Sequence, residues 1–343
     1  MKKVTSRDIA KIAGVSQSTV SCVLNNHAGI SISKETREHV LKIAEDLNYS
    51  LPARKYAHKT GEIVIGLMVP NLTNLFYPFL ANEIQMYAQT LGIKTILCNT
   101  IRSIEHEEYY LNYLIEQSVN GIIYTFSPKI HNKKVNMPVV IIGEAESSIY
   151  DLITLDSFKA GSIVAEHLMN LGHKHIAYIT SPIGNISYSR TMRLAGIKGK
   201  LAEKGLDKNL VIMASNDETE QQGQAYEFSL GENFTEVVLE NYPKVTAIIG
   251  VNDMVAAGAL STLHQHGKKI PLDIAVCGFD NLIISQISTP KVTTIDHFSG
   301  HRGKMAVNII KDRIENKETL DSQIKINYEP RLIVRGSTEV NSK

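Results

Sequence analysis

The sequence predicts a small all-α helix-turn-helix headpiece followed by an α/β core of two doubly wound parallel-sheet lobes. Three observations support this fold class. The first 49 residues hold three short helical patterns around a glycine turn. From residue 62, short apolar runs of strand type alternate with helical stretches, which is typical of parallel sheets covered on both faces. About 280 residues of this alternation exceed one ordinary domain and predict two lobes with a cleft between them.

The helix-turn-helix is centred on residues 14–25. Thr5 and Asp8 resemble a capping box that begins a first helix, and Gly14 ends that helix in a turn. Ser16 is a good N-cap for the second helix. At 3.6 residues per turn, this helix has one apolar and one small, polar face. The apolar face is expected to hold Val20, Val23 and Leu24, and the polar face Gln17, Ser18, Ser21 and Cys22.

Residues 33–47 predict a third helix that buries the first two, capped by Ser33 and ended by Asn48. Residues 50–61 follow as a hinge segment. Isolated helices below ~12–15 residues are marginal in water, so we expect this segment to order only when something holds it. The predicted domains are the headpiece 1–49, the hinge 50–61 and the two-lobed core 62–343.

In the core, strands are expected at residues 63–69, 95–98, 121–126, 138–142, 175–181, 245–251 and 274–279. Helices are expected at residues 78–91, 157–171, 190–204, 219–240 and 253–267. Ligands of open parallel sheets bind beyond the carboxyl ends of the strands. The candidate ligand-binding loops are therefore residues 70–77, 99–103, 181–193, 252–253 and 280–282.

The charge is distributed unevenly along the chain. Residues 1–60 carry ten Lys/Arg against five Asp/Glu, a net charge of +5, so the remainder carries 1 − 5 = −4. A basic head beside a mildly acidic body predicts that only the head binds a polyanion. The three cysteines are widely spaced, which favours reduced thiols over a disulfide framework. We expect no signal peptide and no membrane helix, and a cytoplasmic location.

Enzyme and metal signatures are missing. The sequence holds no GxG, GxxxxGK[ST], GxSxG or HExxH. His173 and His175, like His264 and His266, have no carboxylate or cysteine at ligand spacing, so we interpret them as solvated turns and helix ends. We therefore expect no catalytic residues, no cofactor and no metal.

Several motifs resemble those of one family, in that family's order. The headpiece matches at residues 14–16, 19–21, 23–25, 36–37 and 47–49, the hinge at 53–57, and the core at 69–77, 171–173, 193–196, 252–253, 278–281 and 334–338. On these residues the chain is similar to the LacI/GalR transcriptional regulators. The resemblance implies a dimeric DNA-binding regulator whose core is similar to type I periplasmic binding proteins and takes a small effector, usually a sugar.

DNA contacts are expected from the helix-turn-helix and, by the resemblance, from the hinge. The expected DNA-binding residues are Thr5, Arg7, Ser16, Gln17, Ser18, Thr19, Ser21, Cys22, Asn25, Arg54 and Tyr56. The alternatives are a solvated helix face and a solvated linker. Relatives carry an arginine at Cys22, and a thiol cannot make its bidentate guanine contact. Tyr56 stands where relatives wedge a leucine into the minor groove.

Effector contacts are expected from five residues, namely Asn71, Phe76, Arg193, Asn252 and Asp280. Phe76 would be the floor of a sugar ring or simply part of the core. Arg193, Asn252 and Asp280 would supply the convergent donors and acceptors that a polyol needs, or would cap surface helices instead. Asp156 resembles a position near the lobe crossing, where capping is equally expected. Glu144 stands near where many relatives carry a ligand-contacting aspartate.

The predicted function is a sequence-specific DNA-binding regulator, a repressor, controlled by a small-molecule effector that is a sugar or sugar derivative. Its partners would be double-stranded DNA with a pseudo-palindromic operator, the effector and a second copy of the chain in a homodimer. An alternative is a cytosolic sugar-binding sensor without specific DNA recognition. A Rossmann-type enzyme is the third hypothesis, against which the missing GxG argues.

Overall fold

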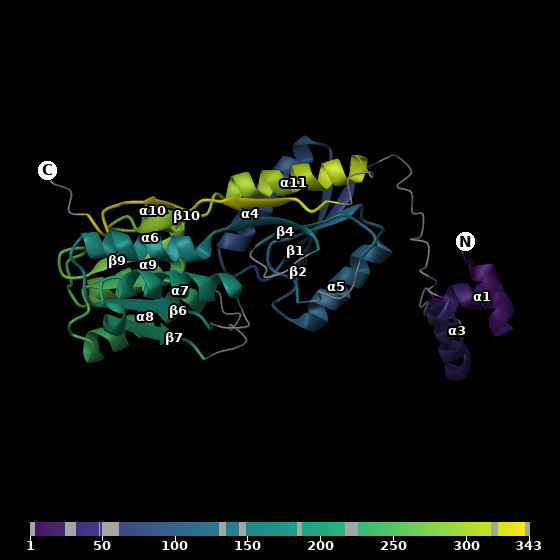
Figure 1. The fold of residues 1–343 in the computed structure, drawn as a ribbon, viewed down its shortest axis with the longest axis horizontal. Helices are drawn as coiled ribbons and strands as arrows, with labels where there is room; N and C mark the ends of the chain where they lie inside the picture. The colour runs from purple at the N-terminus through teal and green to yellow at the C-terminus, as the bar shows by residue number, and fades with distance from the viewer. Residues whose placement is uncertain are drawn as a thin grey trace. The chain divides into compact units, whose positions relative to one another are not determined.

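The computed structural model describes residues 4–24, 32–47, 49, 62–129, 135–143, 149–183, 187–216, 226–316 and 322–339. The chain divides into a small N-terminal unit and a large unit that holds nearly all of the remainder (Figure 1). The expected hinge segment at residues 50–61 lies outside the described residues.

The headpiece consists of α1 (Ser6–Ala13), α2 (Gln17–Leu24) and α3 (Lys34–Asp46). The predicted capping box is present, because the Asp8 carboxylate accepts hydrogen bonds from the Thr5 nitrogen at 2.8 Å and hydroxyl at 2.6 Å. Gly14 ends α1 with a φ of 67°, a left-handed conformation that glycine adopts without strain. Ser16 and Ser33 are confirmed as N-caps, because each hydroxyl accepts the backbone N–H three residues later.

The headpiece has its own small hydrophobic core. It is formed by Ile9, Ala10, Val20, Val23, Val40, Ile43 and Ala44. One expectation about α2 is wrong: Cys22 does not share the exposed polar face, because its side chain is only 8% exposed. Cysteine behaves as a small hydrophobe, and a buried position suits it for that reason.

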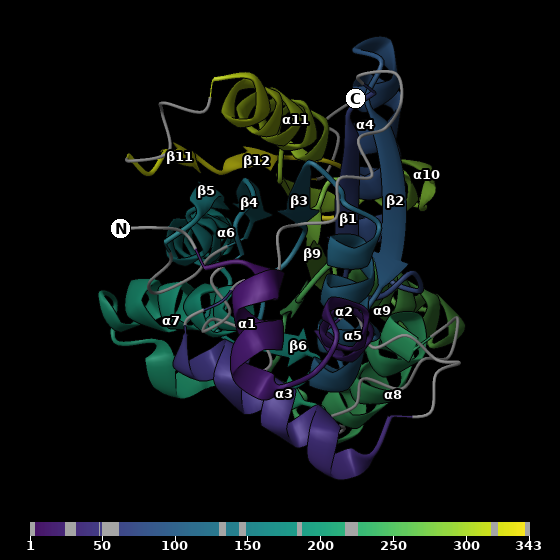
Figure 2. The ribbon, with the colours of Figure 1, turned by 90° about the vertical axis from the view of Figure 1, so that its right-hand side faces the viewer.

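The large unit contains two six-stranded sheets with the same order of strands. In lobe 1 the order is β11-β5-β4-β3-β1-β2, and all neighbours are parallel. These strands are β1 (Val64–Val69), β2 (Lys94–Asn99), β3 (Gly121–Tyr124), β4 (Val139–Ile142), β5 (Asp151–Leu155) and β11 (Lys325–Tyr328). Figure 2 shows β5, β4, β3, β1 and β2 side by side in this order.

In lobe 2 the order is β12-β10-β9-β8-β6-β7, which is parallel except for the antiparallel edge strand β12. These strands are β6 (Ile176–Thr180), β7 (Leu210–Ala214), β8 (Ala247–Gly250), β9 (Ala275–Asp280), β10 (Thr293–Asp296) and β12 (Arg331–Ile333). The predicted class of two doubly wound parallel-sheet lobes is therefore confirmed, with one antiparallel edge.

Helices cover both faces of each sheet. Lobe 1 has α4 (Phe76–Thr90), α5 (Ile104–Glu116) and α11 (Ser299–Glu315), and lobe 2 has α6 (Ser157–Asn170), α7 (Tyr188–Ala202), η1 (Asp207–Asn209), α8 (Tyr226–Asn241), α9 (Asp253–Gln265) and α10 (Ile283–Ile287). In lobe 1, α4 and α11 pack on one hydrophobic cluster and α5 on the other. In lobe 2, α6 packs against α7 and α8 against α9.

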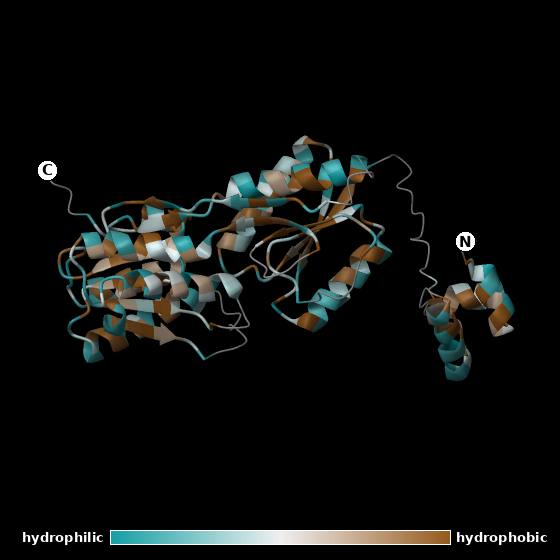
Figure 3. Ribbon diagram, viewed as in Figure 1, coloured by the Kyte–Doolittle hydropathy of each residue, from teal (hydrophilic) through white to brown (hydrophobic). Residues whose placement is uncertain are grey.

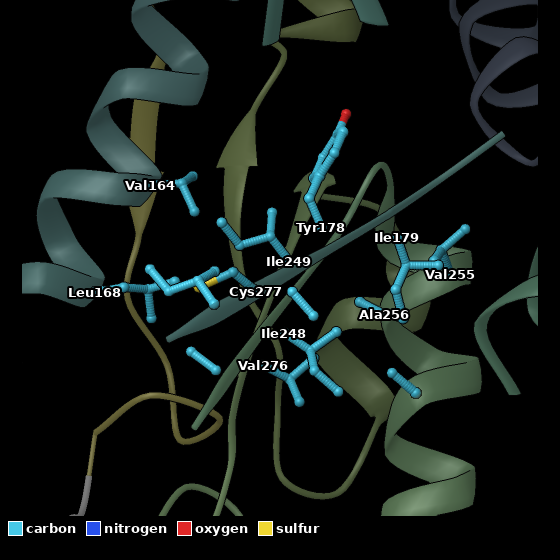
Figure 4. Close-up of a cluster of buried hydrophobic side chains, with 14 of the residues drawn as sticks. Val164, Leu168, Tyr178, Ile179, Ile248, Ile249, Val255, Ala256, Val276 and Cys277 are labelled. Carbon is cyan, nitrogen blue, oxygen red and sulfur yellow. The ribbon is translucent and has the colours of Figure 1, made fainter. Parts of the chain in front are cut away.

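The apolar side chains are concentrated in the strands. Figure 3 shows brown, hydrophobic strands between helices whose surfaces are mixed. The core of lobe 2 joins residues of β6, β8 and β9 to residues of the helices beside them, as Figure 4 shows for Val164, Leu168, Ile248 and Val276. None of the described helices has both the length and the apolar character needed to cross a bilayer.

The chain passes between the lobes at three connections, from β5 to α6, from β10 to α11, and from β11 to β12. All seven expected strands and all five expected helices are present, with ends shifted by a few residues. The expected helix at 219–240 is described only from Tyr226. The sequence interpretation did not include β5, β7, β10, β11, β12, α5, η1, α10 or α11.

Candidate functional sites

A polar surface on the headpiece joins the start of α1 to the start of α2. Gln17 accepts a hydrogen bond from Arg7 Nε at 3.3 Å and donates one to the Ser6 hydroxyl at 3.1 Å. The Ser16 hydroxyl lies 2.7 Å from that of Ser18 and 2.8 Å from that of Thr19. These contacts hold short donors and acceptors in place on an exposed surface, as base-edge and phosphate contacts require.

Most of the residues predicted to bind DNA lie on or beside this surface. Those with exposed side chains are Thr5, Arg7, Ser16, Gln17, Ser18 and Ser21, and Thr19 is half-buried. Cys22 is the exception, since it is buried. The other predicted contacts, Asn25, Arg54 and Tyr56, lie outside the described residues.

A second polar cluster lies at the carboxyl ends of the lobe 2 strands, and His297 is its centre. His297 follows β10, Asp280 is the last residue of β9, and Arg193 projects from α7. The His297 Nδ1 atom lies 3.1 Å from Asp280 Oδ1, and its Nε2 atom lies 3.2 Å from Arg193 Nη2. All three side chains are buried, with exposed fractions of 3%, 7% and 9% for His297, Asp280 and Arg193.

The donor capacity of arginine determines the tautomer of His297. A guanidinium can only donate hydrogen bonds, so His297 Nε2 accepts the bond from Arg193. The proton of the neutral ring is therefore on Nδ1, which faces Asp280 Oδ1 at 3.1 Å. In this arrangement the imidazole is neutral and joins a cation to a carboxylate.

The Arg193 guanidinium is held on several sides. Its Nη1 donates to the backbone oxygen of Val251 at 2.7 Å, and its plane lies over the Phe279 ring at 4.8 Å. Its Nε is buried and makes no hydrogen bond in the described part of the chain. One donor of a fixed guanidinium thus remains for another partner.

Burial dominates the protonation of this cluster. Desolvation, followed by the charges of Arg193 and Arg302, holds the pKa of His297 well below its usual value. Desolvation also raises the pKa of Asp280 well above its usual value, although Arg193 acts in the opposite direction. Nearby, burial raises the pKa of Asp253 to about 7, while hydrogen bonds from Thr294 and Leu282 lower it.

Lobe 1 contributes an aromatic ring and an amide. The ring of Phe76, at the start of α4, meets the His297 ring edge to face at 5.7 Å between centroids. Asn74 Nδ2 donates to Glu227 Oε1 of lobe 2 at 2.8 Å, and both residues are buried. The segment after β1 therefore contacts lobe 2 through an aromatic pair and a hydrogen bond.

The structure unites three of the five predicted effector residues, because Phe76, Arg193 and Asp280 all contact His297. Asn252 caps α9 by accepting from the Val255 nitrogen at 3.0 Å, and Asn71 accepts from the Asn74 nitrogen at 3.1 Å. Asn252 thus has the capping role that was its alternative to ligand contact, and Asn71 makes a local hydrogen bond within its loop. Asp156 likewise caps α6 by accepting from the Lys159 nitrogen.

The sequence interpretation missed His297 itself. The available signal was its place directly after a strand, but β10 was not predicted. Among the described residues, no group of three or more His, Cys, Asp or Glu side chains could hold a metal ion. All three cysteines are buried and unpaired, which agrees with the expected reduced thiols.

Comparisons with known proteins match both parts of the chain. The family described as "Bacterial regulatory proteins, lacI family" matches residues 5–51, and "Periplasmic binding protein-like domain" matches residues 165–338. A ribose operon repressor from Halalkalibacterium halodurans is 32% identical over 98% of this chain and 97% of its own length.

Two solved structures show the same fold. One is a LacI family transcriptional regulator from Enterococcus faecium with bound ribose, which is 26% identical, covers 80% of this chain and 98% of its own, and has a TM-score of 0.69. The other is a lac repressor dimer bound to operator and the anti-inducer ONPF. It is 23% identical, covers 99% of this chain and 100% of its own, and has a TM-score of 0.71.

Proposed function

Since this chain belongs to the LacI family of bacterial regulatory proteins, we propose that it is a DNA-binding transcriptional repressor controlled by a small sugar. The observation that carries the effector half of this proposal is the Arg193–His297–Asp280 cluster with Phe76 beside it. The exposed polar surface of α1 and α2, in a chain whose residues 1–60 carry a net charge of +5, supports the DNA half.

The headpiece would place the start of α2 in a major groove, with Gln17 and Ser18 at base edges and Arg7 at phosphates. The family resemblance adds Arg54 and Tyr56 as hinge contacts in the minor groove. Two copies of the chain would bind two half-sites of a pseudo-palindromic operator. The lac repressor structure, a dimer on its operator, supports this stoichiometry.

The effector would bind where the carboxyl ends of the two sheets meet. Arg193 offers a donor, Asp280 an acceptor and Phe76 an apolar ring, which together suit a neutral polyol. Asn71 and Asn252 would stand next to it. A relative named for a ribose operon and a similar structure with bound ribose make ribose the first sugar to test.

Control of DNA binding would follow from lobe closure. Three connections join the lobes, so a ligand that binds both would favour one closure angle over another. A ligand shifts such an equilibrium only by its differential affinity for the two states, typically ~1–3 kcal/mol.

Gel shifts and calorimetry with the full chain test the two halves separately. Binding to a genomic fragment should be sequence-specific and should fall steeply with salt, because phosphate contacts release counterions. Gln17→Ala should weaken binding to that fragment more than to a scrambled one. Equal binding to both fragments by the wild type would instead favour the sensor without specific DNA recognition.

Titration with ribose, and with other pentoses and hexoses as comparison, tests the effector half. A sugar that binds should raise the midpoint of thermal unfolding by mass action and should change the gel shift. If no sugar of the panel binds, the sugar assignment is wrong, whatever the DNA result.

A further inference from the structure

We propose that His297 is a positioning residue, which fixes Arg193 and Asp280 as a donor–acceptor pair for a sugar hydroxyl and connects this pair to lobe 1. The proposal rests on the proposed function for its ligand. Its geometric part concerns the chain alone and can be tested without a sugar.

The first step concerns the two polar contacts of the His297 ring. Its Nδ1 atom lies 3.1 Å from Asp280 Oδ1 in an ion-pair contact, and its Nε2 atom accepts a hydrogen bond from Arg193 Nη2. In the described part of the chain, the buried Arg193 Nε makes no hydrogen bond. A hydroxyl group both donates and accepts, so it suits an arginine donor that lies on the same histidine as a carboxyl group.

The second step is that only a neutral ring permits this arrangement. Arg193 on α7 and Arg302 on α11 face His297 as cations, and Asp280 on β9 faces it as the carboxyl group. A proton on Nε2 would place an imidazolium against the Arg193 guanidinium and break their hydrogen bond. The Arg193 guanidinium would then lose the hydrogen bond from Nη2 to His297 that holds it in this orientation.

The third step is the position of His297 in the chain. It lies in the connection from β10 to α11, which is one of the three connections between the lobes. Its ring also packs against Phe76 at the start of α4 in lobe 1. A movement of lobe 1 relative to lobe 2 would therefore change the surroundings of the residue that orients Arg193 and Asp280.

Two variants separate the hydrogen bonds of His297 from its ring. His297→Phe keeps an aromatic ring against Phe76 and removes both polar contacts of the imidazole. His297→Gln replaces them, because a side-chain amide offers an acceptor to Arg193 and a donor to Asp280. His266→Gln is the matched control, since His266 is a half-exposed surface residue that contacts Glu236.

Nitrogen NMR of the full chain labelled in its histidine and arginine side chains tests the geometry. We expect one histidine, absent from both His297 variants, that keeps its proton on Nδ1 and stays neutral at the pH at which an ordinary imidazole takes up its proton. We expect the Arg193 Nε–H signal to shift in His297→Phe and to return close to its wild-type position in His297→Gln. A protonated His297, a proton on Nε2, or an Arg193 Nε–H signal that shifts in neither variant would overturn the proposal.

Calorimetry with ribose tests the consequence for binding. His297→Phe should lose about tenfold or more in affinity, the usual effect of removing a hydrogen bond to a charged group. His297→Gln should stay within about threefold of the wild type, and His266→Gln should match it. Equal losses in the Phe and Gln variants would overturn the positioning role. If the wild type binds no ribose, the ribose assignment fails, and the NMR result still decides the role of His297.

Discussion

The two lobes share one strand order but contribute different chemistry where they meet. Read from β2 and from β7, the sheets run through the same sequence of positions, and only β12 reverses direction. Lobe 1 contributes an aromatic ring and an amide, from Phe76 and Asn74, whereas lobe 2 contributes the charged pair Arg193 and Asp280. The scaffold is thus repeated, and the function lies in the side chains at the ends of its strands.

The lobes also differ in how tightly their helices are held. In lobe 2, α6 and α7 meet backbone to backbone: a Cβ on Gly196 would lie 1.9 Å from the Phe158 oxygen, and one on Gly161 would lie 2.1 Å from the Arg193 oxygen. In lobe 1, where α4 meets α11, a Cβ on Gly303 would meet the Ile84 side chain at 3.0 Å. The helix that carries the charged donor is therefore held by close backbone packing.

The largest effect should come from disturbing this support. We expect Gly196→Ala to destabilise lobe 2 by about 3 kcal/mol or more, because the methyl group meets backbone that cannot rotate away. Gly199→Ala is the control on the same helix. Its Cβ would lie 3.5 Å from Phe158 Cζ, so it should be neutral or stabilising by up to about 1 kcal/mol. Urea unfolding measures both, and equal midpoints would refute the difference in helix support.

Removing the charged donor should have the next largest effect, on ligand binding. Arg193→Ala should weaken ribose binding about 10- to 100-fold, because it removes a charge-assisted hydrogen bond and leaves His297 Nε2 and the Val251 oxygen without their donor. Lys198→Ala, on the exposed side of the same helix, should not change the affinity. Calorimetry would measure both, and unchanged binding by Arg193→Ala would place the effector elsewhere.

The contribution of lobe 1 should be smaller. Phe76→Ala should weaken ribose binding about five- to tenfold, since it removes apolar contact area and the ring pair with His297 but no hydrogen bond. Phe79→Ala, which is 46% exposed on the same helix, is the matched control. If Phe76→Ala reduced the affinity more than Arg193→Ala, lobe 1 rather than lobe 2 would make the larger contribution to ligand binding, against this prediction.

Local signals explain which elements the sequence predicted. The caps at Thr5, Ser16 and Ser33 and the turn at Gly14 depend on residues within one helical turn, so their chemistry is visible in the sequence. Buried strands with continuous apolar runs were predicted for the same reason.

Tertiary contacts explain what the sequence did not predict. The strand β10 contains two threonines that are fully buried. Thr293 donates to the Arg335 oxygen, and Thr294 donates to Asp253 Oδ1, about 40 residues away in each case. A polar segment that is satisfied by such distant partners does not resemble a buried strand, and without β10 the place of His297 at a strand end was not visible.

The smallest predicted effect concerns pH and is specific to lobe 2, because the lobe 1 partner of the ring, Phe76, does not titrate. His297 keeps its pKa well below 6.5 in the folded chain, so between pH 7 and pH 6 only the unfolded chain takes up its proton. Stability therefore falls as the pH falls, and this residue alone should account for up to about 0.7 kcal/mol over that interval.

The pH dependence of His297 must be measured against the His297→Gln variant. Asp253 and Asp280, whose pKa values are raised, change the stability of both proteins in the opposite direction. The free energy of unfolding of the wild type minus that of His297→Gln should decrease from pH 7 to pH 6. An increase would mean that His297 is protonated in the folded state, and the hydrogen bond that orients Arg193 would then not exist.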